Sequence, residues 1–254
     1  MSMSRPLLSR IFIAAALAFA WFDVSGVAYV RGIPYPHDLS SLIDLSWATG
    51  PLAFAVLTAF YAAALARFIA ARDVRAATAA FALLALTAHI HEAQWPGSAG
   101  VRNGLGLPGG GLAAYLLADR ACVLFGRADQ RERWSREAAC GVAAAAYTLA
   151  AASKLIYGGP AWAGGANIAM YIASQAYMRS AALLPLRLWF PRHLALCGAF
   201  GVGTLIIEGS GLVFLWPRAR PAYAVLACGL HLGIWLIMGL VHFDFLLMVV
   251  GLAL

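Results

Sequence analysis

Long apolar runs follow one another along almost the whole chain, separated only by short breaks that carry arginine, glycine or proline. A helix needs about 20 apolar residues to cross the hydrocarbon core of a bilayer. The runs predict helices over 11–30, 47–70, 74–94, 109–125, 138–157, 194–216 and 222–241, with a short last helix from residue 243. Segment 164–178 is too short for an ordinary span, which predicts a re-entrant or interfacial helix.

These runs predict an all-α fold, a polytopic transmembrane helix bundle of about seven or eight spans. We expect one integral membrane domain over residues 1–254, without an extramembrane domain. Of the 254 residues, 63% are hydrophobic and 11% are charged, whereas a soluble domain has about 25% charged and about 45–50% apolar residues. The composition therefore excludes a soluble globular protein and a disordered one. The first run also resembles a signal peptide ending at Ala20, but it continues to Val30 and is interpreted as a span.

Two arginine-rich turns set the expected orientation. They cover residues 67–75 and 126–137, two predicted spans apart, so they must lie on the same side of the membrane as the N-terminus. The positive-inside rule makes this side cytoplasmic, and the loops at 31–46 and 95–108 then face outward.

Because arginine replaces lysine almost throughout and alanine is abundant, the composition is typical of a GC-rich bacterial genome. We therefore expect a bacterial inner membrane protein.

The basic residues behind the net charge of +7 lie mostly between apolar runs. No basic stripe with interleaved aromatic residues is present in the sequence, so no nucleic-acid partner is expected. The expected partners are membrane lipids and a hydrophobic small molecule or a secreted peptide. The four cysteines have no paired spacing, which predicts small core residues rather than disulfides, and no metal site is predicted.

Ionisable side chains inside the predicted spans are candidate functional residues, because charge is costly in the hydrocarbon core. The candidates for lining a cavity are Asp23, His89, His91, Glu92 and Glu208. With the N-terminus inside, Asp23, the segment from His89 to Glu92 and Lys154 fall in the outer half of the bilayer. Their common depth predicts a shared polar cavity that opens to the outer side.

Several of these residues also have a structural interpretation. His89 and His91 can lie at the water interface, and they point to opposite sides of a helix, so they cannot bind one metal together. We expect Arg120 to be a buried partner of another group. Glu208 lies among glycines that equally favour close helix packing. His231 belongs to a stripe on the seventh predicted span that is more typical of core packing than of a cofactor site.

Lys154 is the only lysine among the 18 basic residues. Arginine stays protonated, whereas a desolvated lysine can lose its proton and act as a base. Tyr147 lies seven residues earlier, on the same helical face. A lysine near a helix end can also extend to the interface. A nearby carboxylate from Glu92 or Glu208 would stabilise the ammonium and indicate a structural role, while an apolar setting would indicate a base.

Three stretches of the second half carry a family resemblance. They are Tyr147-Thr-Leu-Ala-Ala-Ala-Ser-Lys154-Leu155, then Trp162-Ala-Gly-Gly165-Ala166, then Glu208 with the Pro217-Arg-Ala-Arg220-Pro221 turn and His231-Leu-Gly-Ile-Trp-Leu-Ile-Met238-Gly239. In this order and spacing they resemble the horizontally transferred transmembrane (HTTM) family, which is related to the membrane module of vitamin K-dependent gamma-carboxylases. The first half fits that family only in outline.

The resemblance implies an enzyme whose cavity faces the outer side, with a quinol or vitamin K-like quinone as cofactor. In the carboxylases the lysine of this motif deprotonates the reduced vitamin. Lys154 would take that role, with Tyr147 and His231 completing the catalytic set. We expect no peptide-binding extramembrane domain, and Asn103 is followed by Gly104 where the family has an Asn-His pair. True glutamate carboxylation is therefore not expected, and modification of a secreted peptide fits better.

Two other classes of function stay open. A cytochrome b-type electron carrier would use His89, His231 or His242 as haem ligands, although haem ligands are expected at matching depth. A non-catalytic quinone-binding or assembly subunit like those of the DoxX family would need no base at all. Substitution of Lys154 by arginine separates the catalytic function from this last one.

Overall fold

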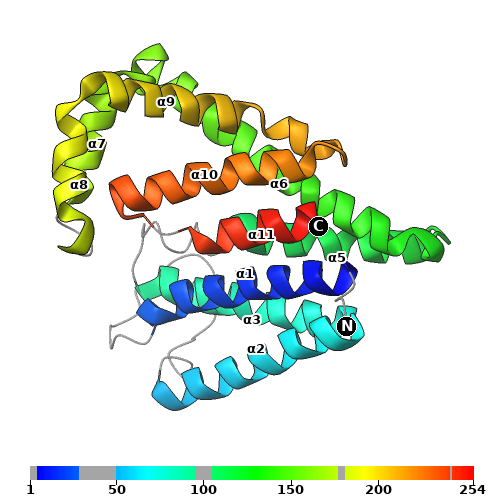
Figure 1. Cartoon of the computed structure of the whole chain (residues 1–254). Coiled ribbons are helices and arrows are strands. Elements are labelled where there is room, and N and C mark those ends of the chain that lie inside the picture. The colour runs from blue at the N-terminus through cyan, green and yellow to red at the C-terminus, as the bar shows by residue number, and fades with distance from the viewer. Residues whose placement is uncertain (1–4, 29–49, 95–104, 177–180, 241) are drawn as a thin grey trace. The chain divides into compact units, whose positions relative to one another are not determined.

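The computed structural model describes residues 5–28, 50–94, 105–176, 181–240 and 242–254, and every regular element in these ranges is helical (Figure 1). The ten α-helices of the described ranges are α1 (Arg5–Ala28), α2 (Pro51–Ala71), α3 (Val74–Gln94), α5 (Gly110–Leu124), α6 (Arg131–Gly158), α7 (Gly165–Ala176), α8 (Leu184–Trp189), α9 (Leu194–Gly209), α10 (Arg220–Met238) and α11 (Phe243–Ala253). The predicted all-α fold is confirmed for this part of the chain.

Within the described residues, four helical segments are long and apolar enough to cross a membrane. They are Pro51–Ala71, Ala128–Gly158, Leu194–Leu215 and Arg220–Met238. Between 17% and 33% of each apolar window is buried inside the protein, so most of these apolar side chains lie on the surface. A large apolar surface is unfavourable in water and is stable against lipid tails. The four segments therefore suggest an integral membrane protein.

Most helix boundaries lie within a few residues of the apolar runs, but α1 begins at Arg5, before the expected start at 11, and α6 begins at Arg131, before the expected start at 138. The helix expected over 74–94 coincides with α3. The run at 194–216 is α9 followed by a 3-10 turn over Gly211–Leu215. The run at 164–178 forms α7, a helix of only 12 residues, and its depth in a membrane stays a prediction. The short helix α8 was not expected, because its six residues contain a proline and no helical period can be recognised over that length.

Contacts divide the chain into two compact units, and each is described here by itself. Unit 1 contains Met1–Val142 with Val250–Leu252 and Leu254, and unit 2 contains Ala143–Val249 with Ala253. Helices α6 and α11 contribute to both. The expectation of a single domain over the whole chain stays a prediction.

In unit 1, helices α1, α2 and α3 pack against one another (Figure 1). Trp21 of α1 stacks on Tyr61 of α2 with ring centroids 4.5 Å apart, and the Tyr61 hydroxyl donates to the Leu17 carbonyl. The Trp21 indole N–H donates to Thr58. Stacked aromatic rings with satisfied polar groups are stable in an apolar interior, so this contact fixes α1 on α2.

In unit 2, helix α7 packs on α9 and on α10. The core between them consists of Ile168, Ala169, Ile172, Cys197 and Ile237. A Cβ atom at Gly165 would lie 2.1 Å from the Leu194 carbonyl oxygen. Only glycine allows this approach, which brings the start of α7 against the start of α9.

All four cysteines are free, and Cys122, Cys140 and Cys197 are buried, as expected for small core residues.

Arg187 of α8 is a buried charge that the sequence did not single out. Only 1% of its surface is exposed, and its guanidinium donates to the carbonyls of Trp235 and Leu236 at 3.3 Å each. These carbonyls belong to the last turn of α10, the negative end of the helix dipole. Arg187 therefore caps α10. The helix ends at Met238, and Gly239, which follows, has a left-handed φ of 72°.

Candidate functional site

Lys154 and Glu208 form an ion pair in unit 2. The Lys154 ammonium, near the end of α6, lies 2.8 Å from Oε1 and 2.6 Å from Oε2 of Glu208, in the last turn of α9. The Glu208 side chain is 10% exposed and that of Lys154 is 24% exposed. A charge-assisted contact to both carboxylate oxygens is strong when water is largely excluded. Lys154 is therefore held by a carboxylate of the neighbouring helix α9.

The Lys154 ammonium also lies 5.2 Å from the centre of the Trp162 ring. A cation within about 6 Å of an aromatic face is attracted by the ring quadrupole. Trp162 follows α6 in the 3-10 turn Pro160–Ala163. The ammonium is thus bordered by one anion and one aromatic ring.

A second polar pair joins α6 to α10. The Tyr147 hydroxyl lies 2.7 Å from Nε2 of His231, and Tyr147 is buried. The Tyr147 ring meets the Tyr223 ring edge to face at 5.7 Å, and the Tyr223 hydroxyl donates to the Ile207 carbonyl. Ile207 directly precedes Glu208, so the aromatic contact connects the two polar pairs through α9 and α10.

The His231 imidazole has one unsatisfied nitrogen. Its Nδ1 is buried and has no hydrogen-bond partner among the described residues. The ring borders His242 at 5.7 Å and Phe245 at 5.9 Å between centroids. Buried polar atoms without a partner are rare in folded proteins. The hydroxyl oxygen of Thr148, one residue after Tyr147, is likewise buried and unpaired. The described part of the protein therefore leaves two buried polar atoms of the site without a hydrogen-bond partner.

Small residues bring these helices close enough for the pairs to form. Ala151 lies between Tyr147 and Lys154 on the buried face of α6. A Cβ atom at Gly211 would lie 2.9 Å from Cβ of Tyr147 and 2.7 Å from the Ala144 carbonyl oxygen. The glycine lets the 3-10 turn after α9 lie directly on α6. Glu208, one turn before Gly211, then faces the α6 surface that carries Lys154.

Arg220 fixes the turn between the 3-10 segment and α10. It is buried, and its guanidinium donates to the carbonyls of Phe214 at 2.9 Å and Leu215 at 3.3 Å. These carbonyls end the segment that began with Gly211. The sequence reading noted Arg220 only as part of a motif, but its contacts set where α10 starts and so position His231 farther along that helix.

Four of the predicted site residues come together, and four are not tested. Lys154, Glu208, Tyr147 and His231 all belong to unit 2. His89 lies on α3 in unit 1, where its Nε2 is buried without a hydrogen-bond partner among the described residues. The side chains of Asp23, His91 and Glu92 lie outside what the structure describes. The shared cavity of the outer half therefore stays a prediction.

The expectation for Arg120 is wrong. Arg120 is exposed, and the buried charged residue of α5 is its neighbour Asp119. Asp119 accepts two hydrogen bonds from Arg131, at 2.9 and 2.7 Å. The spacing of the buried residues Leu112, Tyr115, Asp119 and Cys122 on α5 is helical, and this pattern would have placed Asp119 rather than Arg120 inside.

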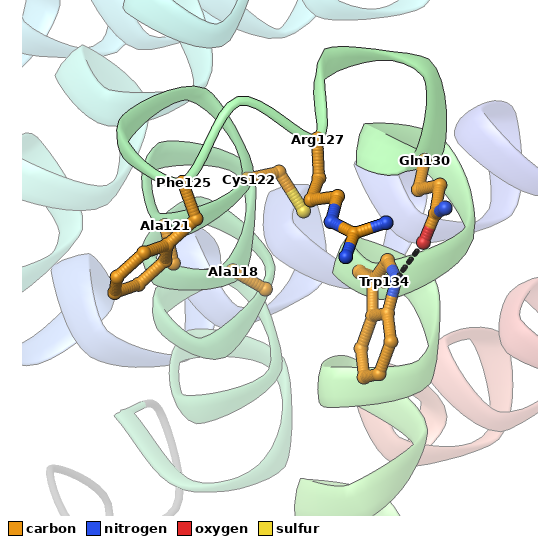
Figure 2. A pocket seen from close by; sticks show the side chains of 7 residues that line it. All are labelled: Ala118, Ala121, Cys122, Phe125, Arg127, Gln130 and Trp134. Carbon is orange, nitrogen blue, oxygen red and sulfur yellow. Dashed lines mark hydrogen bonds between the residues drawn. The ribbon is translucent and has the colours of Figure 1, made fainter.

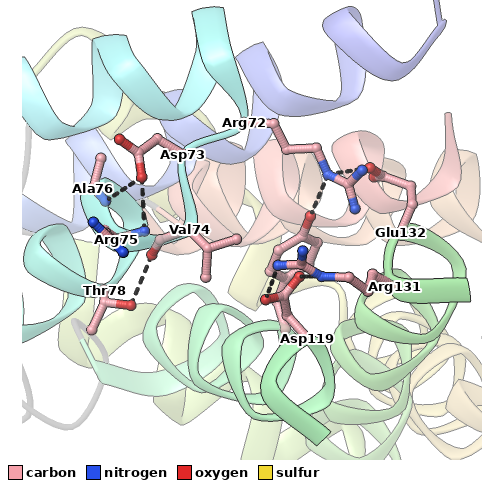
Figure 3. A network of polar contacts seen from close by, with 10 residues as sticks. Arg72, Asp73, Val74, Arg75, Ala76, Thr78, Asp119, Arg131 and Glu132 are labelled. Carbon is pink, nitrogen blue, oxygen red and sulfur yellow. Dashed lines mark hydrogen bonds and ion pairs between the residues drawn. The ribbon is translucent and has the colours of Figure 1, made fainter. Parts of the chain in front are cut away.

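The Asp119–Arg131 pair belongs to a polar network in unit 1 (Figure 3). In the same network Arg72 forms an ion pair with Glu132 and donates to the Tyr115 hydroxyl. The network joins the turn after α2 to the start of α6. It accounts for two of the arginines that set the expected orientation, which itself stays a prediction.

Within the described residues, no group of three or more His, Cys, Asp or Glu side chains is arranged to hold a metal ion. The chain was compared with protein-family models, with curated proteins and with solved structures, and none of these comparisons gave a match. What the protein does must therefore be argued from the geometry of unit 2.

Proposed function

We propose that this protein is an integral membrane enzyme in which Lys154 and Glu208 together accept a proton from a quinol-like, lipid-like or peptide substrate that enters from the outer side. The observation that carries the proposal is the ion pair itself, which is bordered by an aromatic ring and placed between apolar helices. Ionisable residues inside membrane segments mark functional sites by default, because they are costly to keep there.

The two residues of the ion pair have different roles, Glu208 as the proton acceptor and Lys154 as the cation. Lys154 in contact with a carboxylate is an ammonium and has no lone pair to accept a proton, whereas the Glu208 carboxylate has several. When a substrate O–H or C–H bond breaks, its proton goes to a Glu208 oxygen and its electron pair stays on the substrate. The Lys154 ammonium then offsets the negative charge of the substrate anion. The base role expected for Lys154 alone thus becomes a role of the pair.

The second polar pair supports binding of a hydroxyl-bearing substrate. The unsatisfied Nδ1 of His231 and the hydroxyl of Thr148 are buried polar atoms that a ligand can satisfy. These residues fit a quinol, which offers two hydroxyl groups on an apolar ring. When bound, the quinol would supply the acidic O–H group. Tyr147 holds the His231 ring through Nε2 and so orients Nδ1.

The membrane arrangement that goes with this proposal is a bundle of about seven or eight spans with α7 as a re-entrant or interfacial helix. The N-terminus would lie in the cytoplasm of a bacterium and the site in the outer half of the inner membrane. The resemblance to the HTTM family supports the same assignment, because residues of its motifs form both polar pairs of unit 2, Lys154 with Glu208 and Tyr147 with His231.

A quinol analogue tests the proposal directly. The full chain, reconstituted in lipid under anaerobic conditions, is titrated with a short-chain naphthoquinol, and the ultraviolet spectrum reports loss of the hydroxyl proton. We expect the quinolate spectrum with the wild type and with Ser153→Ala, an exposed neighbour of Lys154. Lys154→Met and Glu208→Gln should leave the quinol protonated. A wild type that leaves the quinol protonated contradicts proton transfer to the pair.

One observation favours a second function, a non-catalytic quinone-binding or assembly subunit. The same ion pair links α6 to α9, and in such a subunit its whole role would be to hold the two helices together. Lys154→Arg separates the two functions, because arginine keeps the contact to the carboxylate but changes the position and geometry of the charge. Quinolate that forms with the wild type and falls in Lys154→Arg, at unchanged thermal stability, would favour the enzyme. A wild type that forms no quinolate, together with a Lys154→Met variant that loses thermal stability, would favour a purely structural contact.

A further inference from the structure

A pocket of about 430 Å³ lies in unit 1, where α5 ends and α6 begins. One side is apolar and consists of Ala118, Ala121, Cys122 and Phe125. The other side carries Arg127, Gln130 and Trp134, which follow the turn (Figure 2). The pocket thus combines an apolar wall with a single charged side chain. It is separate from the residues of the proposed enzyme site and does not depend on that function.

The turn that holds Arg127 is well defined. Gly126 has a left-handed φ of 67°, its N–H donates to the Val123 carbonyl, and the Arg127 N–H donates to the Cys122 carbonyl at 2.7 Å. This is the Schellman arrangement that ends a helix. In Figure 2 the Arg127 side chain points back from the turn toward Trp134. The backbone therefore fixes a cation at one end of the pocket.

The Arg127 charge is not neutralised by the described part of the protein. Its guanidinium forms no ion pair or side-chain hydrogen bond with the described residues. Arg131 lies in the same arginine-rich turn, but Asp119 neutralises its charge. Arg72 on the preceding turn is likewise paired, with Glu132. An unpaired positive charge at the end of an apolar pocket is complementary to an anion that carries an apolar chain.

Aromatic residues place this pocket at a membrane surface. Phe125 is 80% exposed and Trp134 is 54% exposed, and the Trp134 indole N–H donates to Gln130 at 2.7 Å. Tryptophan with its ring in lipid and its N–H among polar groups is typical of the membrane–water interface. The turn at 126–137 is predicted to be cytoplasmic, and the cytoplasmic leaflet is the one that carries anionic lipids.

We propose that this pocket binds an anionic phospholipid of the cytoplasmic leaflet. The lipid phosphate lies at Arg127, and one acyl chain lies along Ala118, Ala121 and Phe125. The geometry distinguishes this site from a diffuse attraction to the arginine-rich turn, because Arg127 is the one arginine among the described residues that line the pocket. Arg133 offers a matched comparison, because it is also exposed in that turn but does not line the pocket.

Native mass spectrometry of the full chain in detergent tests the site. Phosphatidylglycerol and phosphatidylcholine with identical acyl chains are added in turn, and the lipid adducts are counted for the wild type, Arg127→Gln, Arg133→Gln and Ala118→Leu. The wild type should prefer phosphatidylglycerol, and this preference should fall as salt is added. Arg127→Gln should lower phosphatidylglycerol binding about fivefold and leave phosphatidylcholine binding unchanged. Arg133→Gln should bind as the wild type does, and Ala118→Leu should lower the binding of both lipids.

Three results would overturn the proposal. The first is a wild type without a preference for phosphatidylglycerol, which needs no variant to fold. The second is an equal loss of binding in Arg127→Gln and Arg133→Gln, which would mean that the whole turn attracts lipid without a site. The third is unchanged binding of both lipids in Ala118→Leu, which would show that the acyl chain lies elsewhere. Circular dichroism and gel filtration confirm that each variant is folded.

Discussion

Glu208 holds the Lys154 ammonium with both of its carboxylate oxygens, at 2.8 and 2.6 Å. The contact joins α6 to α9 and decides the role of the only lysine in the chain. Sequence reasoning set two outcomes for Lys154, an apolar setting for a base or a carboxylate partner for a structural cation. The observed pair has the carboxylate, so Lys154 by itself does not lie in the apolar setting expected for a base. The proton-accepting role is therefore proposed for Glu208 with Lys154 beside it.

Breaking the Tyr147–His231 contact should destabilise unit 2. Tyr147→Phe leaves Nε2 of a largely buried His231 without a partner, which costs about 1–3 kcal/mol. A double-mutant cycle with His231→Phe, read by thermal or denaturant unfolding in detergent, should give a coupling of about 0.5–3 kcal/mol. A coupling of zero would show that the two side chains do not interact.

Gly211→Ala should separate the 3-10 turn from α6. The new Cβ atom would lie 2.7 Å from the Ala144 carbonyl oxygen and 2.9 Å from Cβ of Tyr147, and such overpacking costs about 1–3 kcal/mol. Gly203→Ala on α9 is the control, because no atom lies within 4 Å of its added Cβ. Alanine in the helix at position 203 should leave the stability unchanged or raise it by about 0.5–1 kcal/mol. Equal melting temperatures for the two variants would rule out the close approach.

Asp73 should make stability depend on pH at the turn between α2 and α3. The backbone N–H of Ala76, and then the Arg67 guanidinium, lower the pKa of Asp73 below its usual value. A lowered pKa in the folded state means that Asp73 stabilises the protein above the unfolded value of about 3.9 and loses this contribution as the pH falls through the folded value. Asp73→Asn keeps the capping oxygen but removes the charge. Its melting temperature should fall less than that of the wild type on acidification, and parallel curves for the two proteins would contradict the assignment.

The topology predicts opposite exposure of two loops. A cysteine at position 133, in the arginine-rich turn, should react with a membrane-impermeant thiol reagent only after cells are permeabilised. A cysteine at position 100 should react in intact cells. Both are introduced into a chain whose four native cysteines are replaced by alanine or serine. The reverse labelling pattern would place the N-terminus outside.

Much of the fold could be predicted, because the apolar runs are long and their ends carry strong signals. Helix α3 matches its predicted bounds, whereas α10 ends at Met238, before its predicted end at 241, because Gly239 caps it in a left-handed conformation. Helix α8 could not be predicted, because six residues with a proline have no recognisable period. Its Arg187 lies in the interior only because the α10 carbonyls accept its hydrogen bonds, a contact between segments far apart in the sequence.

The site could be predicted in its residue types but not in its pairings. Helical spacing alone places Tyr147 and Lys154 on one face of the helix, and Lys154 is a candidate because it is the only lysine in the sequence. Its partner Glu208 lies 54 residues away in the sequence. Helical spacing within one segment does not predict which acidic residue of another helix will contact Lys154. In α5 only Arg120 was expected to be buried, and Asp119 was not considered, although the period of the buried face places Asp119 inside.

The most direct test of the central claim is infrared difference spectroscopy of the reconstituted protein as the naphthoquinol analogue binds. The chain has only four glutamates, so labelling glutamate with ¹³C identifies a glutamate carboxyl band by its shift. If the pair accepts the proton, a carboxylic acid C=O band should appear on binding, shift with the label, persist in Ser153→Ala and vanish in Glu208→Gln. Quinol binding without such a band, or a band that persists in Glu208→Gln, would contradict proton uptake by Lys154 and Glu208.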